Sequence, residues 1–452
     1  MTISVLPDDV LLEIFDFCRK NDVQRLVMGW HVLVHVCQRW RQIVFESRHR
    51  LGLQILCTYG TPVRKSLGSW PAFPIVLKYG HPRGITPFDE DSVITALEHS
   101  DRVCEVRLNV TTGSQLGNLT VVMQEPFPAL THLALVSQDG NAPVIPGSFL
   151  GGSAPSLQKL NLSGIPYPAL PKLLLAATGL VELKLDRIPS TGYISPEAMV
   201  TGLAALTSLR SLFIAFQSPK AHPNQILLPP ETRTALPTLT SFVFDGVREY
   251  LEDFAARIDA PRLDSICVYY FNQLSDFHVP QLSRFIGRSE IINQSHFRRC
   301  DVTLGANRVS GSFYVGDARI DVCIRCQGID WQVSHITQVF TQISPVFFDV
   351  VHFEITTNWF EPPFQLEDMD EIEWLELFRQ LTSVRSLFVS GKLSGNVIRA
   401  LGDVVEVLPA LDVLCSEDQP ASTVSELDAA RRLSGRPVSI VTTRREFHER
   451  LN

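Results

Sequence analysis

The chain has 452 residues, of which 45% are hydrophobic and 19% are charged, a composition typical of globular rather than disordered proteins. Lys and Arg number 40 against 48 Asp and Glu, so the net charge is −8 and the chain repels phosphate backbones. We therefore expect no nucleic-acid partner. No apolar run approaches the roughly 20 residues of a membrane-spanning helix, so we expect no membrane contact.

The first residues, "MTISVLPDDVLLEIF", lack the basic region of a signal peptide. The nine cysteines are odd in number and lack the spacing of a disulfide framework, which favours free thiols in a reducing compartment. These features predict a cytoplasmic and/or nuclear protein.

Residues 1–51 predict short amphipathic helices. Pro7 suits the first helical position, and Asp8 and Asp9 follow where the helix dipole favours negative charge. Two apolar stripes recur at helical spacing. They consist of Val10, Leu11, Ile14, Phe15 and Cys18, and of Leu33, Val36, Cys37, Trp40 and Val44. Because so small a pair cannot bury both stripes alone, it has to pack on the rest of the chain or on a partner.

The segments "LPDDVLLEIF" and "VCQRWRQIV" resemble the F-box, a short helical module. The resemblance implies docking on a Skp-type adaptor and thereby on the cullin scaffold of a ubiquitin ligase. Cys18, where a leucine is usual, and a long connector at 19–31 depart from the family pattern. The positions that match the motif, and so the implied partner-binding residues, are Leu6, Pro7, Val10, Leu11, Ile14, Phe15, Val36, Cys37, Trp40 and Arg41.

Residues 52–99 are rich in Pro, Gly and aromatic side chains, as in "TPVRKSLGSWPAFPIVLKYGHPRGITPF". Such a stretch cannot carry a long helix, and its apolar content predicts an ordered joint rather than a flexible linker. The beginning of this joint also resembles the segment that follows the module in a large group of fungal F-box proteins.

Residues 100–280 repeat an apolar pattern in which a first position is followed by apolar residues at +3 and +5. Spacings of 23 to 30 residues separate successive units, and this length with an L-x-x-L-x-L core predicts an irregular leucine-rich-repeat-type solenoid. "EYLEDFAARI" predicts one of its helices. The units begin at Val103, Leu130, Leu157, Leu180, Leu209, Leu239 and Leu263.

The pattern falters at 281–370, where alternating apolar residues on both sides of Gly316-Asp317 predict a β-hairpin. Repeat-like units resume at 371–452, from Val384 and Leu411, with a last strand at "RPVSIV". The predicted fold class is therefore α/β, an N-terminal helical F-box module followed by an irregular solenoid.

The sequence contains no motif that predicts an enzyme, a cofactor or a metal site. "CIRC", from Cys323 to Cys326, lacks a second ligand pair for zinc, and in a strand the two thiols point to opposite faces. The acidic residues of "DMDEIEWLEL" fit a solvated helix start better than a cation site. We expect no catalysis on this chain.

The resemblance to the F-box, together with the repeats, implies a substrate-recognition subunit of a ubiquitin ligase that docks on the adaptor through its first helices and binds a protein target through the solenoid. The target-binding candidates flank the central apolar positions of the repeats, with mixed charges and aromatic rings that suit a protein partner. They are Arg107, His132, Lys159, Glu182, Lys184, Phe213 and Tyr269, with Glu105, Asn161, Asp186 and Asp245 on the same side.

Two alternatives remain. In the first, the helices only cap a repeat scaffold, which predicts that Leu6, Pro7, Val10 and Trp40 are buried against it, whereas an open apolar patch indicates a partner. In the second, distant residues form a cryptic active site, which predicts a deep pocket with convergent titratable groups.

Overall fold

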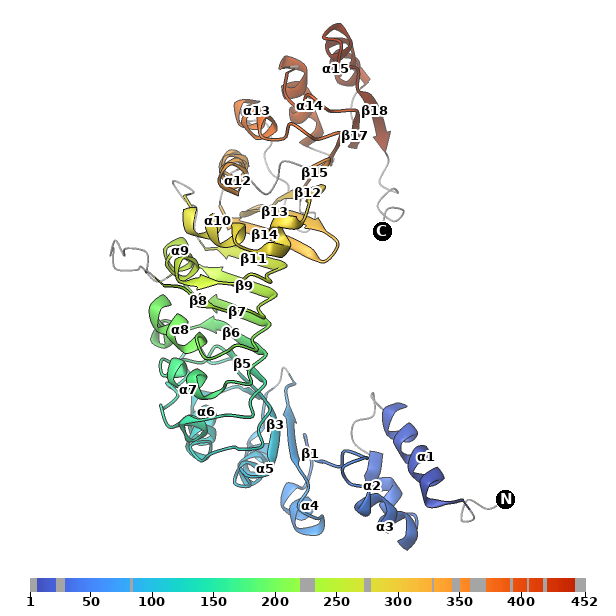
Figure 1. Cartoon of the computed structure of the whole chain (residues 1–452), viewed down its shortest axis with the longest axis vertical. Helices are drawn as coiled ribbons and strands as arrows, with labels where there is room; N and C mark the ends of the chain where they lie inside the picture. The colour runs from blue at the N-terminus through green and yellow to red at the C-terminus, as the bar shows by residue number, and fades with distance from the viewer. Residues whose placement is uncertain are drawn as a thin grey trace. The chain divides into compact units, whose positions relative to one another are not determined.

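A computed structural model describes the protein (Figure 1). The described residues are 6–21, 29–81, 84–219, 232–271, 278–326, 329–343, 350–357, 371–390, 393–404, 406–417 and 421–443. The chain forms two compact units, Met1–Lys159 and Leu160–Asn452. Both are mixed α/β, and the larger unit contains a large, mainly parallel sheet. The side chain of Cys18 and the residues Asp368 and Asp370 of the acidic segment lie outside the described part.

The first unit begins with three helices rather than the two that the apolar stripes predicted: α1 (Asp8–Asn21), α2 (Gly29–Val34) and α3 (Gln38–Glu46). The expected second stripe is interrupted at residues 35–37, where Cys37 has extended backbone angles (φ −158°, ψ 170°). The side chain of Arg41 donates a hydrogen bond to the Val34 carbonyl oxygen at 3.0 Å and so satisfies the end of α2. Val36 and Cys37, within this break, are exposed.

A parallel ladder begins at Ile55, within the stretch 52–99 that the sequence predicts as an ordered joint. The pairs β1–β2, β2–β3 and β3–β4 are all parallel. Most side chains of the first two strands are buried, but prolines and glycines around them hid the repeat pattern. The elements are β1 (Ile55–Cys57), α4 (Val63–Ser69), β2 (Ile75–Tyr79), α5 (Pro87–Leu97), β3 (Val103–Val110), α6 (Gly113–Val122), β4 (His132–Ser137) and the 3-10 helix η2 (Phe149–Gly152).

The second unit continues with strands that follow one another in the sheet in chain order, β5, β6, β7, β9 and β11. The last four are paired in parallel, and β8 and β10 form a separate two-stranded sheet. The strands are β5 (Lys159–Ser163), β6 (Glu182–Ile188), β7 (Ser211–Phe216), β8 (Thr234–Ala235), β9 (Ser241–Gly246), β10 (Ile258–Asp259) and β11 (Ser265–Tyr270). The helices between and after them are α7 (Leu170–Ala176), η3 (Ser190–Gly192), α8 (Pro196–Leu203), α9 (Arg248–Arg257), α10 (Pro280–Gly287) and α11 (Glu290–Gln294).

An antiparallel hairpin interrupts the parallel order where the repeat pattern falters. The strands β12 (Arg299–Leu304), β13 (Arg308–Val315) and β14 (Ala318–Arg325) are joined antiparallel, and the turn between β13 and β14 holds Gly316 at φ 57°. On its outer sides β14 pairs in parallel with β11, and β12 pairs in parallel with β15 (His352–Thr357). The hairpin therefore lies within the sheet and leaves the ladder continuous.

The remaining strands extend the ladder to the end of the described chain. β16 (Ser386–Val389), β17 (Val413–Glu417) and β18 (Ser439–Thr443) pair in parallel, each with the strand before it. The helices of this part are α12 (Ile329–Ile343), α13 (Glu371–Arg379), α14 (Ser394–Asp403) and α15 (Ala421–Leu433).

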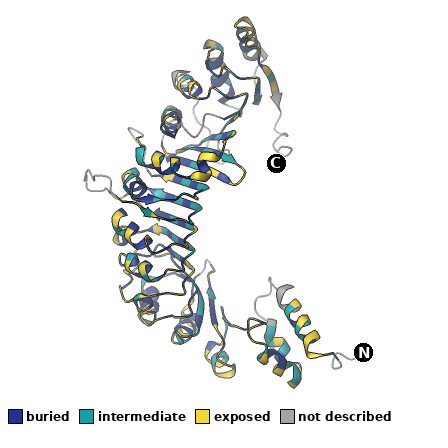
Figure 2. Ribbon diagram, viewed as in Figure 1, coloured by how far each residue is buried: buried dark blue, intermediate teal, exposed yellow. Residues whose placement is uncertain are grey.

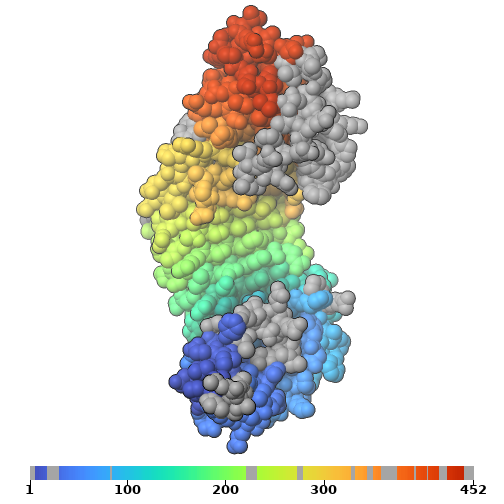
Figure 3. Space-filling model, turned by 90° about the vertical axis from the view of Figure 1, so that its right-hand side faces the viewer, coloured from blue at the N-terminus to red at the C-terminus, as the bar shows by residue number. Residues whose placement is uncertain are grey.

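The core of the larger unit lies between the sheet and the helices that cover one of its faces (Figures 1 and 2). In each predicted repeat the first apolar residue and those at +3 and +5 are buried, as in Leu209, Leu212 and Ile214. The side chains between them point to the opposite face, because successive residues of a strand alternate. In the larger unit this face lies away from the helices, which Figure 1 draws on the left, and Figure 3 shows the molecule from the side away from them.

Candidate interaction surfaces

Helix α1 has two apolar stripes with different surroundings. Leu11 and Phe15 are buried, whereas Val10 is 42% exposed and Phe17 is 68% exposed. Val10, Ile14 and Phe17 are spaced by four and three residues, so they follow one line on the helix surface, and Ile14 between them is half-buried. This outer line is an apolar surface on a helix that already has a buried inner face. We call Val10, Ile14 and Phe17 the outer stripe.

Aromatic packing and arginine side chains hold α1 against α3. The ring centroids of Phe15 and Trp40 are 4.8 Å apart. Arg39 bonds both the Asp8 carboxylate and the Leu6 carbonyl oxygen, each at 2.6 Å, and Arg50 forms an ion pair with Glu13. These two arginines are therefore engaged within the helical module.

The predicted partner-binding residues divide between core and surface. Leu11 and Phe15 belong to the core of the module, and Leu6, Ile14 and Trp40 are half-buried. The exposed members are Pro7, Val10, Val36, Cys37 and Arg41. Sequence analysis missed Phe17, although its spacing of seven residues from Val10 places it on the same side of the helix.

A different set of residues joins the helical module to the repeats of the first unit. Trp30 packs edge-on against Trp70 and Phe73, with centroid distances of 5.1 and 5.4 Å, and its ring N–H donates to the Gln54 carbonyl oxygen at 3.0 Å. Phe45 packs on the same two rings. None of these residues belongs to the outer stripe.

The target-binding candidates lie on strands, at positions that alternate with the buried apolar residues. In the first unit Glu105 of β3 forms ion pairs with Arg107 at 2.5 Å and with Lys78 at 3.9 Å, and it is the register partner of His132. Lys159 is exposed at the end of this unit. The expected polar surface is therefore present here, with most of its charges already paired.

In the second unit the candidates on β6 and β7 meet directly. Lys184 and Phe213 are register partners, and the ammonium group lies 4.9 Å from the ring centroid, a cation–π contact. Asp186 accepts a hydrogen bond from Ser163 at 2.8 Å. Glu182 and Asn161 are half-buried on the same face, and Tyr269 of β11 is exposed there, as the register partner of Asp245.

The hairpin region of this face carries a network of ion pairs that sequence analysis did not anticipate. Arg299 of β12 bonds Asp301 at 3.2 Å and Glu354 at 2.9 Å, and its guanidinium lies 5.3 Å from the Tyr314 ring centroid. The Tyr314 hydroxyl donates to Asp301. These contacts cross three neighbouring strands, which only the strand order brings together.

A pocket of about 230 Å³ opens beside this network. Its lining includes Tyr269, Thr303, Arg308, Ser310, Arg319 and Asp321. Cys323 also lines it, but burial raises the pKa of this thiol to about 11, so it stays protonated at neutral pH and is a poor nucleophile. Cys326 is likewise buried, with a pKa raised to about 12 by burial, and both are free cysteines.

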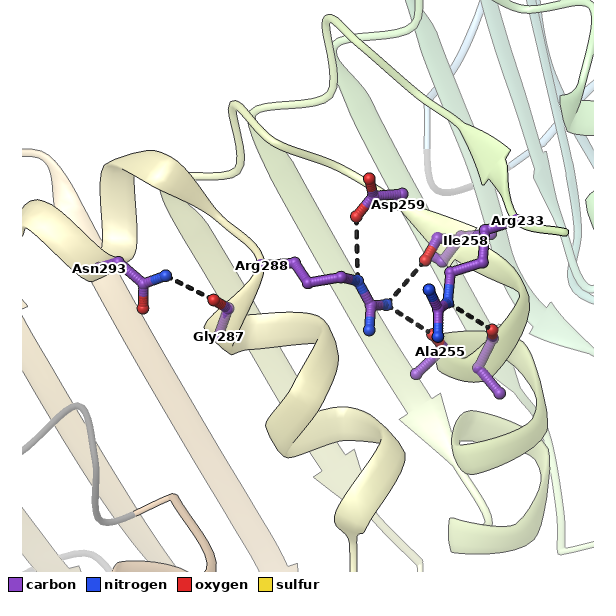
Figure 4. A network of polar contacts seen from close by, with 8 residues as sticks. Arg233, Ala255, Ile258, Asp259, Gly287, Arg288 and Asn293 are labelled. Carbon is purple, nitrogen blue, oxygen red and sulfur yellow. Dashed lines mark hydrogen bonds and ion pairs between the residues drawn. The ribbon is translucent and has the colours of Figure 1, made fainter. Parts of the chain in front are cut away.

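On the helix side of the sheet, two arginines bind the C-terminal end of α9 (Figure 4). Arg288 donates to the carbonyl oxygens of Ala255 and Ile258 at 3.2 and 3.0 Å and to Asp259 at 3.0 Å. Arg233 donates to the Ala256 carbonyl oxygen at 3.2 Å. Cations are favourable at this end of a helix, so the pair has a structural role. Within the described ranges, no group of three or more His, Cys, Asp or Glu residues is placed to hold a metal ion.

Comparisons with known proteins add little to this description. No family model matches the sequence, and no curated protein matches it. Among solved structures, the chain is similar to the leucine-rich repeat-containing protein LegL7 from Legionella pneumophila at 13% identity. The similarity covers 85% of this chain and 98% of that one, with a TM-score of 0.29. In the described part of the chain, no helix is both long and apolar enough to cross a membrane.

Proposed function

We propose that the chain is an F-box-type substrate receptor. Its three N-terminal helices would dock on a Skp-type adaptor, and the open face of its strand repeats would bind a protein target. The chain itself performs no chemistry in this proposal. It raises the effective concentration of the target near a ubiquitin-charged enzyme.

The exposure of the outer stripe carries this proposal. A helical cap on a repeat array buries its apolar residues against that array, but Val10 and Phe17 are exposed while Trp30 and Phe45 make the contact with the repeats. An exposed apolar line on a module with its own core is typical of a surface that a partner covers. The match of Leu6, Pro7, Val10 and Ile14 to the F-box motif supports the choice of adaptor.

One observation favours the alternative, a repeat scaffold with capping helices. The cluster of Trp30, Phe45, Trp70 and Phe73 attaches the module firmly to the first repeats, as a cap requires. The two functions differ in what the outer stripe does, because a cap needs no partner there.

The test is co-purification of the full chain with a co-expressed Skp-type adaptor. We expect the native chain to bind and the double variant Val10→Asp/Phe17→Asp to lose at least tenfold in affinity, because two charges would be buried at the contact. Phe88→Asp is the matched control, because Phe88 is 79% exposed on α5, outside the helical module.

Circular dichroism would establish that each variant is folded. A folded native chain that fails to bind the adaptor contradicts the receptor function and leaves the capped scaffold. Equal binding by the native chain and the double variant would show that the outer stripe is not the docking surface.

A further inference from the structure

Two histidines lie at the contact between the helical module and the first repeats. His31 of α2 stacks on Trp30, with the ring centroids 3.8 Å apart and the planes at 25°. The His31 ring also packs edge-on against Trp70 at 5.3 Å. His35, four residues later, packs edge-on against the same Trp70 ring at 5.8 Å. One indole ring is therefore shared by two side chains of the only type whose ordinary pKa lies between pH 5 and pH 8.

The surroundings of His31 disfavour its charged form. The side chain is half-buried, and burial, followed by the neighbouring His35, lowers its pKa. The face of an indole ring attracts a cation, but the rings of Trp30 and Trp70 also exclude water that a charged imidazole needs. Protonation of His31 is therefore unfavourable while the module is closed against the repeats.

The described charged groups around this contact do not offset that cost. His35 is the one among them that shifts the pKa of His31, and it does so by repulsion. The others on the packed elements have partners of their own or are exposed. They are Arg39 with Asp8, Arg41 with the Val34 carbonyl oxygen, Glu46 with Gln42, Arg64 with Asp91, Arg102 with the Phe73 carbonyl oxygen, and the exposed Lys65.

We propose that this contact is a pH-dependent joint, in which protonation of His31 and His35 loosens the attachment of the helical module to the first repeats. Like charges on the two rings repel each other, and the open form returns both rings to water. The joint makes the attachment of the module respond to mildly acidic pH. The inference does not rest on the proposed function, because neither an adaptor nor a target takes part in the contact.

The direction of the pH dependence follows from the pKa of His31. In the closed contact this pKa lies below the ordinary value of about 6.5, so the open form binds the proton more readily. The stability of the closed contact is therefore complete above about pH 6.5. It decreases as the pH falls below that value and levels off below the pKa of the closed form.

Hydrogen exchange of the full chain at pH 7.4 and pH 5.5, corrected for the intrinsic exchange rates, tests this proposal. We expect the protection factors of α2 and α3 to be lower at pH 5.5 by about fivefold or more, while those of β7 change by less than about twofold. His31→Phe keeps an aromatic ring beside Trp30 but cannot be charged, so it should remove most of this difference. His49→Phe replaces an exposed histidine after α3 and should keep the difference in full.

Four results would overturn the inference. The first is equal protection of α2 and α3 at the two pH values, and the second is stronger protection at pH 5.5, which would mean that the attraction of the indole rings for a charged imidazole outweighs the lost hydration. The third is a folded His31→Phe variant with the full pH dependence. The fourth is a parallel loss of protection in β7, which would indicate general acid unfolding. If His31→Phe does not fold, His31→Gln takes its place.

Discussion

The indole rings of Trp30 and Trp70 meet edge-on, with their centroids 5.1 Å apart and their planes at 76°. Trp30 belongs to the helical module and Trp70 follows α4 in the first repeats. His31, His35 and Phe45 also contact the Trp70 ring. The Trp70 side chain therefore forms much of the connection between the helical module and the repeats of the first unit.

Replacing Trp70 with alanine should loosen the helical module while the repeats stay folded. Edge-on aromatic pairs contribute about 0.5 to 1.5 kcal/mol each, so we expect the opening free energy of the module to fall by about 2 kcal/mol. Hydrogen exchange should become faster at the amides of α3 and remain unchanged in β7. Trp331→Ala, which removes an exposed tryptophan from α12, is the control, and equal exchange in the two variants would contradict the assigned role of Trp70.

Replacing Gly202 on α8 with alanine should lower the unfolding free energy, although alanine has the higher helix propensity. A Cβ atom on Gly202 would lie 2.8 Å from the Cα of Pro171 on α7, so Gly202→Ala should cost about 1 to 3 kcal/mol of unfolding free energy despite the roughly 1 kcal/mol that alanine gains in a helix. Gly117 of α6 has no atom within 4 Å of that position, and Gly117→Ala should therefore be stabilising. Urea denaturation of both variants is the measurement, and destabilisation by both would mean that the contact with Pro171 is not the cause.

The sequence predicted the strands of the repeat units well because each unit buries the same three positions. Leu239, Phe242 and Phe244 are all buried, and this requirement leaves a period that can be read without knowing the neighbours. The break at residues 35–37 was missed because Val36, Cys37 and Trp40 fit a helical stripe, and only the folded chain shows the Arg41 side chain on the Val34 carbonyl oxygen.

The cluster of polar residues at the hairpin could not be predicted from the sequence, because it depends on which strands are paired and in which register. The turn at Gly316 can be predicted, but the opposition of Arg308 and Arg325 depends on the register of the two strands. The proximity of Asp245 to Arg325 depends further on the pairing of β11 with β14. Strand order is a tertiary property, because it follows from how whole strands pack rather than from the pattern within each of them.

Arg288, which binds the C-terminal end of α9, should contribute measurably to the stability of the larger unit. Arg288→Met keeps much of the aliphatic side chain but removes bonds to two carbonyl oxygens and to Asp259. Hydrogen bonds to charged groups contribute about 1.5 to 3 kcal/mol, so we expect a loss of about 2 kcal/mol in urea denaturation. Arg284→Met in α10 removes an exposed arginine and should change the unfolding free energy by less than about 0.5 kcal/mol. Similar losses in both variants would refute the capping role.

Asp245 gives a pH dependence whose sign can be worked out. Burial raises the pKa of this carboxyl in the folded chain, so its ionised form is less favourable there than in the unfolded chain, and the destabilisation is fully present above the folded pKa. Asp245→Asn should therefore stabilise the protein at neutral pH. This advantage should shrink as the pH falls through the pKa of Asp245 in the folded chain. It should vanish below the pKa of Asp245 in the unfolded chain, because residue 245 is then neutral in the native protein as well as in the variant.

Thermal denaturation of the native protein and of Asp245→Asn between pH 3 and pH 7 measures the difference in stability, with Asp317→Asn in the exposed hairpin turn as the control. An advantage of Asp245→Asn that stays constant over this range would show that ionisation of Asp245 is not its source.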